Sequence, residues 1–246
     1  MYYESFGEGR PIVFLPGWGG DNGEGRDTHE PVFEGRSGWR RIYVDPPGTG
    51  KSPSDASIVD QDGMLDAIAG TIDEVVGSDR FALAGTSAGG LHSRGLIKRD
   101  PSRILGLLLR VPGVVVDRTK RTLPSDDYLD QTADFVAASA DKDRRYYDAV
   151  DDIADLDFLN RIQSDPRTYA LREDPAIRFE GPTLIVTGRQ DTMTGYADAW
   201  SILDDYPRAT YAVLDQEDHG LPVRRHAVYR ALVGDWLDRM AERPDA

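Results

Sequence analysis

A glycine-rich turn between an apolar run and a helix-like segment constrains the fold of this chain more than any other feature. Residues 81–84 are Phe-Ala-Leu-Ala, the pattern of a short buried strand, and residues 91–99 are predicted to form a helix. Residues 85–89, between them, are Gly-Thr-Ser-Ala-Gly. Small side chains let a strand and a helix approach closely through a sharp turn, which strains the serine backbone and makes its hydroxyl project from the top of the sheet. Ser87 is therefore the first candidate for a functional residue.

Predicted strands and helices alternate along most of the chain. Alternation predicts an edge strand at residues 2–6, and the other predicted strands lie at residues 12–15, 41–44, 81–84, 104–109, 183–186 and 210–214. Apolar residues at helical spacing predict helices at residues 63–76, 91–99, 196–203 and 222–240. This alternation indicates an α/β fold, with a mainly parallel sheet that helices cover on both faces.

Residues 118–178 interrupt the alternation. This segment is polar and has no strand pattern, but two stretches of it carry helical spacing. The first stretch comprises Tyr128, Leu129, Thr132, Phe135 and Val136, and the second comprises Tyr146, Tyr147, Val150, Ile153 and Ala154. We expect residues 118–178 to form a small helical cap, inserted after the strand at 104–109 into a core made of residues 1–117 and 179–246.

The amino-acid composition excludes several classes of protein, of functional site and of binding partner. The 246 residues are enough for one α/β domain with a large core. They contain no charged-then-apolar leader and no apolar run of membrane-spanning length, so a cytoplasmic protein without a membrane partner is expected. With no cysteine, disulfides, thiolate metal sites and cysteine nucleophiles are excluded. The formal net charge of −14 repels phosphate backbones, which argues against a nucleic-acid partner.

Four short motifs occur in a distinctive order. They are Leu-Pro-Gly-Trp-Gly-Gly at 15–20, Asp-Pro-Pro-Gly-Thr-Gly-Lys-Ser at 45–52, the serine turn at 85–89, and Gly-Arg-Gln-Asp at 188–191 followed by His219. In order and spacing they resemble the α/β-hydrolase family, in its branch with a serine nucleophile, and the resemblance covers nearly the whole chain. It implies the α/β-hydrolase fold and makes the serine turn a nucleophile elbow.

The resemblance also implies a catalytic triad of Ser87, His219 and Asp191. A serine hydroxyl is a poor nucleophile at neutral pH and needs a base. His219 lies in a polar loop after the strand at 210–214, where the family's catalytic histidine resides. The histidine needs an acceptor that fixes its tautomer, and Asp191, shortly after the strand at 183–186, matches the family's acid position.

Other residues compete for these roles. Asp117 is the rival acid, because some members of the family place their acid after the strand that corresponds to 104–109. His92 is the rival base, although it lies inside the predicted elbow helix and its side chain should point away from the serine hydroxyl. His29, in a long loop after the strand at 12–15, is expected either to line the entrance of the site or to lie at the surface, and His226 is expected on an exposed face of the last helix.

Two backbone N–H groups are expected to form an oxyanion hole. In this family one belongs to the residue after the nucleophile, here Ala88, and the other comes from the loop after the first buried strand, here Trp18. The family usually has histidine-glycine in that loop, whereas this chain has Pro16 and Gly17. The motif's first position is not the donor, so the hole should survive. The Trp18 indole is expected either to wall the acyl pocket or to pack under the cap.

A phosphate-binding loop is the main alternative for residues 46–52. This stretch resembles the phosphate loop of AAA-type ATPases and follows a strand. However, Asp45 stands where such a loop begins with glycine, and residues 53–55, Pro-Ser-Asp, favour a turn where a helix should begin. The same residues match a turn of the hydrolase family, which is the interpretation we prefer.

The predicted function is a serine hydrolase that works through an acyl-enzyme, most simply on a carboxylic ester of small or medium size. No metal or cofactor is needed, and the partner is a small-molecule substrate. The layout is also similar to carbon–carbon bond hydrolases of ring-cleavage products and to proline iminopeptidases. A non-catalytic ligand-binding protein on the same fold is a further alternative, although a pure receptor has no need of a complete triad.

Overall fold

A seven-stranded sheet forms the centre of the molecule, in the computed structural model that describes residues 1–125, 132–146, 148 and 150–242. The strand order is β1-β3-β2-β4-β5-β6-β7. Its strands are β1 (Tyr3–Phe6), β2 (Arg10–Leu15), β3 (Trp39–Val44), β4 (Phe81–Thr86), β5 (Ile104–Arg110), β6 (Thr183–Gly188) and β7 (Ala209–Leu214). All neighbouring pairs are parallel except β1 and β3, which are antiparallel at one edge. This confirms the predicted α/β fold with a mainly parallel sheet.

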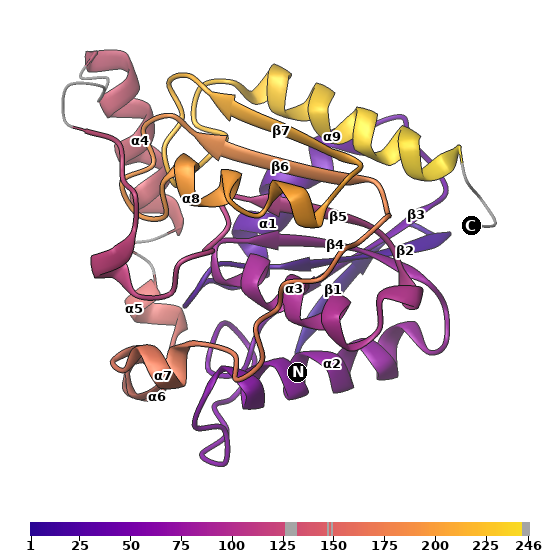
Figure 1. Ribbon diagram of the computed structural model, residues 1–246, viewed down its shortest axis with the longest axis vertical. Helices are drawn as coiled ribbons and strands as arrows, with labels where there is room; N and C mark the ends of the chain where they lie inside the picture. The colour runs from indigo at the N-terminus through magenta and orange to yellow at the C-terminus, as the bar shows by residue number, and fades with distance from the viewer. Residues whose placement is uncertain (126–131, 147, 149, 243–246) are drawn as a thin grey trace.

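Helices cover both faces of the sheet (Figure 1). On one face lie α2 (Gln61–Val76), α3 (Ala88–Arg99) and α8 (Tyr196–Trp200), and on the other lie α1 (Asn22–His29) and α9 (His226–Ala241). Successive residues of a strand point to opposite faces, so Val13 packs in the cluster with α2 and α3, while Ile12 packs in the cluster with α9. Because both of their faces are buried, the central strands β4, β5 and β6 are nearly continuous apolar runs, which made them visible in the sequence.

Helix α1 was not predicted, and the expectation of a long loop there is wrong. Its sequence has no apolar stripe, so it carries no helical periodicity. Polar contacts hold it instead. The Asp21 carboxylate caps its first turn by accepting the N–H of Gly23 at 2.9 Å, and Asp45 accepts both the backbone and the side-chain N–H of Asn22 at 2.8 Å.

The last helix begins four residues later than predicted, at His226 instead of residue 222. The reason is the carboxylate of Glu217, which is fully buried. It accepts the backbone N–H groups of Val223, Arg224 and Arg225. These hydrogen bonds hold the three residues outside the helix. Glu217 lies two residues before His219, and the contact therefore also fixes the loop that carries this histidine.

Within the described residues, the α-helices between β5 and β6 lie beyond the carboxyl ends of the parallel strands (Figure 1). They are α4 (Ala133–Tyr146), α5 (Val150–Ile153), α6 (Leu156–Gln163) and α7 (Pro166–Tyr169). Helix α6 packs Phe158 and Ile162 against Ile58 and Met64 of the core. These helices are the predicted cap, whose limits at residues 118 and 178 stay a prediction. Of the residues in the two predicted stretches, Tyr128, Leu129 and Tyr147 lie outside the described residues.

Residues 45–52 form a turn that is held by Asp45. Its buried carboxylate accepts the N–H of Lys51 at 2.9 Å, and the Ser52 hydroxyl donates to the Asp45 carbonyl at 2.7 Å. No helix starts at Lys51, since the next helix, α2, begins at Gln61. The turn thus lacks the helix N-terminus on which a phosphate loop depends. None of the helices in the described ranges is long and apolar enough to cross a membrane.

Candidate active site

Ser87 lies where β4 ends at Thr86 and α3 begins at Ala88. Its φ is 51° and its ψ is −114°, in a region that residues other than glycine rarely occupy. Strained backbone of this kind persists only where the surrounding structure holds it, and it is concentrated at functional sites. The conformation is the sharp strand-to-helix turn that the sequence predicted.

Two glycines and a neighbouring strand hold this turn. A Cβ atom on Gly85 would lie 2.3 Å from the carbonyl oxygen of Gly89, and one on Gly89 would lie 2.3 Å from that of Leu15. Both positions therefore exclude any side chain. The N–H of Ser87 donates to the Arg110 carbonyl at 3.0 Å, which ties the turn to the end of β5.

The structure brings Ser87, His219 and Asp191 together from three separate parts of the chain. The Nε2 atom of His219 is 3.1 Å from the Ser87 hydroxyl oxygen, and its Nδ1 atom is 3.1 Å from Oδ2 of Asp191. If Nδ1 carries the proton and donates it to the carboxylate, Nε2 is left to accept the proton of the serine hydroxyl. This is the arrangement in which a histidine activates a serine.

The Asp191 carboxylate is buried and surrounded by donors. Its Oδ1 atom accepts the N–H groups of Met193 and Thr194 at 2.8 and 2.9 Å, and its Oδ2 atom accepts the Thr194 hydroxyl at 2.6 Å. Burial alone would raise the pKa of Asp191, but the contacts with His219 and Thr194 outweigh it and lower the pKa to about 2. Asp191 therefore faces His219 as an anion at neutral pH.

Replacing Thr194 with valine is expected to lower the free energy of unfolding by about 1.5–3 kcal/mol, because a buried carboxylate loses a hydrogen bond from a side chain of nearly the same shape. Urea denaturation measures the change. The matched control is Thr192→Val, at an exposed position in the same loop. Equal stability of the two variants would contradict this role of Thr194.

Asp117, the rival acid, contacts neighbours in its own turn. Its Oδ1 atom accepts the N–H of Thr119 at 3.0 Å, and Lys120 Nζ lies 3.3 Å from its Oδ2 atom. The carboxylate that meets Nδ1 of His219 belongs to Asp191. The geometry thus favours the acid position that the sequence indicated first.

His29 is buried, so the expectation that it lies at the surface is wrong. Its Nδ1 atom is 2.7 Å from the Gly25 carbonyl, and its Nε2 atom is 2.8 Å from the Tyr229 hydroxyl. Burial is the main cause that lowers the pKa of His29 to about 3, and the charge of Arg110 adds to it. His29 is a neutral packing residue between α1 and α9.

The two remaining histidines lie as expected. His92 is buried within α3, where its Nε2 atom contacts the Gln61 side chain at 2.6 Å, and burial lowers the pKa of His92 to about 4. His226 is exposed at the start of α9. Neither contacts Ser87.

The two predicted oxyanion donors lie beside the serine. The N–H of Ala88 is the first of helix α3, and the first N–H groups of a helix have no acceptor within the helix. The loop that carries Trp18 lies against Ser87, since a Cβ atom on Gly17 would be 3.5 Å from the Cβ of Ser87. The N–H of Gly20 closes this loop by donating to the Gly17 carbonyl at 3.1 Å. The use of both N–H groups as an oxyanion hole stays a prediction.

The Trp18 indole fulfils both of the roles that the sequence left open. It lines the pocket above Ser87, and it packs edge-on against Tyr169 of the cap, with the ring centroids 4.9 Å apart. Trp18 thereby connects the core loop to helix α7.

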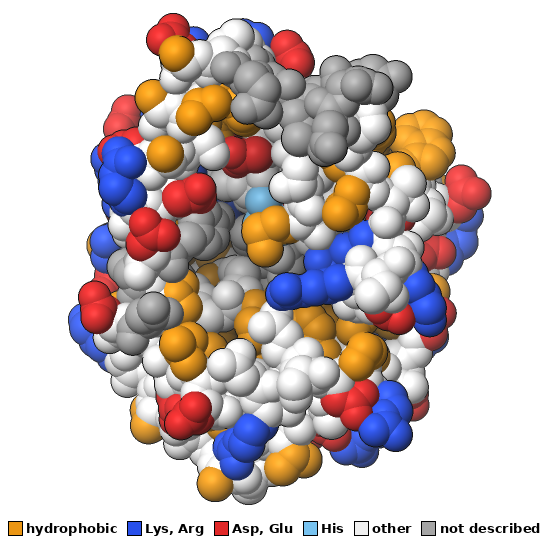
Figure 2. Space-filling view, turned by 90° about the vertical axis from the view of Figure 1, so that its left-hand side faces the viewer, with side chains coloured by type: hydrophobic (Ala, Val, Ile, Leu, Met, Phe, Trp, Pro, Cys, Tyr) orange, Lys and Arg blue, Asp and Glu red, His pale blue; other side chains and the backbone are white. Residues whose placement is uncertain are grey.

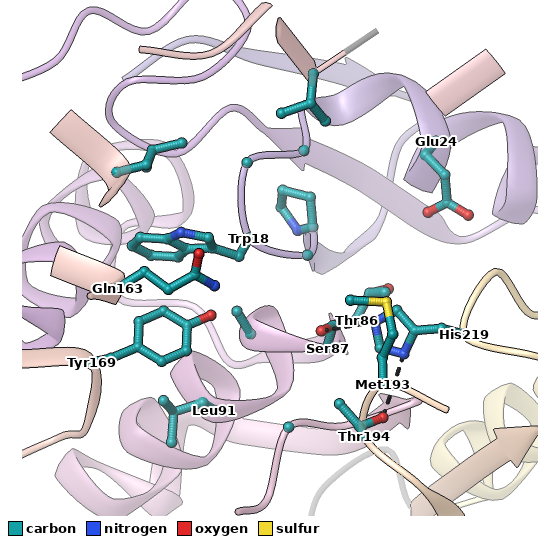
Figure 3. Close-up of a pocket in the computed structure, with 18 of the residues that line it drawn as sticks. Trp18, Glu24, Thr86, Ser87, Leu91, Gln163, Tyr169, Met193, Thr194 and His219 are labelled. Carbon is teal, nitrogen blue, oxygen red and sulfur yellow. Dashed lines mark hydrogen bonds between the residues drawn. The ribbon is translucent and has the colours of Figure 1, made fainter. Parts of the chain in front are cut away.

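A pocket of about 270 Å³ opens above Ser87 and His219, between the core and the cap (Figure 3). From the cap it is lined by Tyr146, Val150, Leu156, Leu159, Asn160, Gln163 and Tyr169, and the core contributes residues that include Trp18, Leu91, Val116, Met193 and Thr194. Most of these side chains are apolar. Figure 2 shows the surface hollowed on this side, with Lys and Arg side chains gathered along one edge of the hollow.

Glu24, which also lines the pocket, belongs to a buried ion cluster. Its carboxylate pairs with the Arg110 guanidinium, whose Nη1 atom lies 2.7 Å from Oε1, and with Lys142 Nζ at 2.9 Å. Arg110 also donates to the Thr86 hydroxyl at 2.9 Å and to a backbone carbonyl. Because Lys142 is on α4 and Glu24 on α1, the cluster ties the cap to the core.

Sequence reasoning did not find this cluster. The spacing of Asp21 and Glu24 is that of a capping box, which could have revealed α1. Arg110 ends an apolar strand, and a charged residue in that position signals a buried partner. For Lys142 there is no local signal, because its partner lies in another part of the chain.

Two curated proteins are similar to part of this chain. The match to the pimeloyl-acyl-carrier-protein methyl ester esterase of Legionella pneumophila (strain Paris) is 30% identical over 109 residues, 44% of this chain and 40% of that protein. The match to a probable proline iminopeptidase of Leptolyngbya boryana is 33% identical over 128 residues, 50% of this chain and 38% of that protein. The chain thus matches about two fifths of the length of either relative.

The fold has relatives among solved structures. The alpha/beta superfamily hydrolase of Oenococcus oeni PSU-1 superposes with a TM-score of 0.84 and 23% sequence identity, over 97% of this chain and 96% of that one. Residues 12–243 match the model of the alpha/beta hydrolase family. Since this match covers nearly the whole sequence, the chain belongs to the alpha/beta hydrolase family.

Proposed function

We propose that this protein is a serine hydrolase that cleaves carboxylic esters of small or medium size through an acyl-enzyme on Ser87. The observation that carries the proposal is the line of contacts from the Ser87 hydroxyl through His219 to the Asp191 carboxylate, each 3.1 Å long. The strained backbone of Ser87 at the floor of the pocket supports it as well.

The mechanism follows from these positions. Ser87 Oγ attacks the ester carbonyl while Nε2 of His219 takes the hydroxyl proton, and the Asp191 carboxylate stabilises the imidazolium that forms. The N–H groups of Ala88 and Trp18 bind the oxyanion. His219 then gives its proton to the leaving alcohol. A water molecule, deprotonated by His219, attacks the acyl-enzyme and releases the acid and Ser87.

The charges of the residues that line the pocket favour an ester as the substrate. An iminopeptidase substrate carries a free amine, which needs a carboxylate of the protein to bind it. The acidic residues among the described lining of the pocket are Asp21 and Glu24. Glu24 is neutralised by Arg110 and Lys142, and Asp21 caps α1. A cationic substrate would therefore find little to bind it, whereas the acyl chain of an ester fits the apolar walls.

A fluorophosphonate probe tests the proposal, because it reacts with an activated serine and mimics the tetrahedral intermediate. We expect one adduct per chain, located by mass spectrometry on Ser87, and no adduct in Ser87→Ala. The control is Ser37→Ala, which removes an exposed serine and should label like the wild type. A wild-type protein that takes no label would favour a non-catalytic binding protein.

A further inference from the structure

Hydrogen-bond donors gather at the end of the pocket away from Glu24. In Figure 3, Trp18, Gln163 and Tyr169 lie on one side of Ser87 and Glu24 lies on the other. The indole Nε1 of Trp18 is buried and has no hydrogen-bond partner within the described ranges. This nitrogen is shielded from solvent, so the donors that a ligand can reach at this end of the pocket are those of Tyr169 and of the arginines that line it.

Arginine side chains add positive charge at this end. Arg118 and Arg121 both line the pocket, and the charges of both act on the Tyr169 hydroxyl. Burial raises the pKa of Tyr169 to about 12, so the hydroxyl keeps its proton at neutral pH and can donate it.

The two arginines differ in what they already bind. Arg121 donates to the carbonyls of Val115 and Met193 at 2.8 and 2.7 Å, so its guanidinium holds the loops around the pocket. Arg118 is exposed, and its guanidinium has no hydrogen bond and no ion pair with residues 1–125, 132–146, 148 and 150–242. In the part of the chain that the structure describes, most arginines are paired with carboxylates, whereas Arg118 lines the pocket with an unpaired guanidinium.

We propose that the ester cleaved at Ser87 carries a free carboxylate, which Arg118 binds at the donor-rich end of the pocket beside Trp18 and Tyr169. The inference rests on the proposed esterase function. A guanidinium matches a carboxylate with two parallel hydrogen bonds, and the phenol of Tyr169 can donate a further one. The net charge of −14 repels an anionic substrate, so a local cation is what makes its binding favourable.

The test compares monomethyl glutarate with methyl butyrate, an uncharged ester with a similar acyl chain. We expect the wild type to have the higher kcat/KM for monomethyl glutarate, and Arg118→Gln to lower the ratio of the two kcat/KM values about tenfold, mainly through KM. Arg118→Lys should recover part of the ratio. The matched control is Lys120→Gln, which removes an equal charge from the same turn, at a residue that pairs with Asp117, and should keep the wild-type ratio.

A second comparison uses the butyryl ester of glycolic acid, which carries its carboxylate on the alcohol side of the ester. The proposal is supported if the wild type prefers monomethyl glutarate or the butyryl ester of glycolic acid to methyl butyrate and Arg118→Gln loses this preference. The preferred ester shows whether the bound carboxylate lies on the acyl side or on the alcohol side. Equal ratios in the wild type and Arg118→Gln would overturn it while the esterase assignment stands. Absence of hydrolysis of all three esters would instead overturn the esterase function. In that case, calorimetric titration of glutarate into wild-type and Arg118→Gln protein decides whether the carboxylate site exists.

Discussion

Replacing Ser87 with alanine is expected to reduce kcat for ester hydrolysis by about 10³-fold or more, the largest effect on activity that we foresee. The substitution removes the oxygen that forms the acyl-enzyme, which is the hydroxyl oxygen 3.1 Å from Nε2 of His219. The activity that remains should come from substrate binding and from the N–H groups of Trp18 and Ala88. Steady-state kinetics on methyl butyrate measures the loss.

This variant should remain folded, because the turn depends on backbone contacts and on Gly85 and Gly89, none of which involve the serine hydroxyl. Its urea denaturation midpoint should therefore lie close to that of the wild type. Ser37→Ala is the matched control and should keep full activity. A folded Ser87→Ala protein with near-normal turnover would refute the assignment of Ser87 as the nucleophile.

Replacing Glu24 with glutamine is expected to lower the free energy of unfolding by about 3–5 kcal/mol, because it leaves two buried cations without their anion. The exposed fractions of the side chains are 12% for Glu24, 1% for Arg110 and 11% for Lys142, so water can replace little of the lost interaction. Glutamine keeps the shape of glutamate, which separates the loss of charge from the loss of packing. Urea denaturation at pH 7 measures the effect.

The pH dependence of stability gives a second measurement on the same variant. Burial alone would raise the pKa of Glu24, but the charges of Arg110 and Lys142 hold it well below its ordinary value of 4.5. A carboxyl with a lowered pKa in the folded state stabilises that state above its unfolded pKa, and this contribution is lost as the pH falls through the folded pKa. The wild type should therefore lose stability below about pH 4.5 more steeply than Glu24→Gln.

The control for Glu24→Gln is Glu34→Gln, which removes the same charge from an exposed site. It should change the free energy of unfolding by less than about 0.5 kcal/mol. If both variants were equally stable, the cluster of Glu24, Arg110 and Lys142 would make no net contribution, and the cap would be held by other contacts such as that between Tyr146 and Asp27.

The predicted strands whose pattern reports burial on both faces lie close to their observed positions. Strands β4, β5 and β6 were found within two residues of their ends, since a parallel strand between two helical layers must be apolar throughout. Polar contacts caused the errors. Helix α1 is held by hydrogen bonds to Asp21 and Asp45, and hydrogen bonds to Glu217 make α9 begin later than predicted. None of these contacts produces a periodic pattern of apolar residues in the sequence.

The sequence by itself determined the fold class, because the apolar runs, the small residues of the turn and the ends of the strands are local properties. Its resemblance to the α/β-hydrolase family then indicated Ser87, Asp191 and His219 as candidate residues. Only the tertiary structure decided which side chains meet. Arg110 and Glu24 are 86 positions apart, and Lys142 reaches Glu24 from the cap. Such pairs depend on how β5, α1 and α4 pack together, and the energy of a buried charge depends on the partner it meets there. The donor-rich end of the pocket arises in the same way, since Trp18, Arg118 and Tyr169 come from three distant segments.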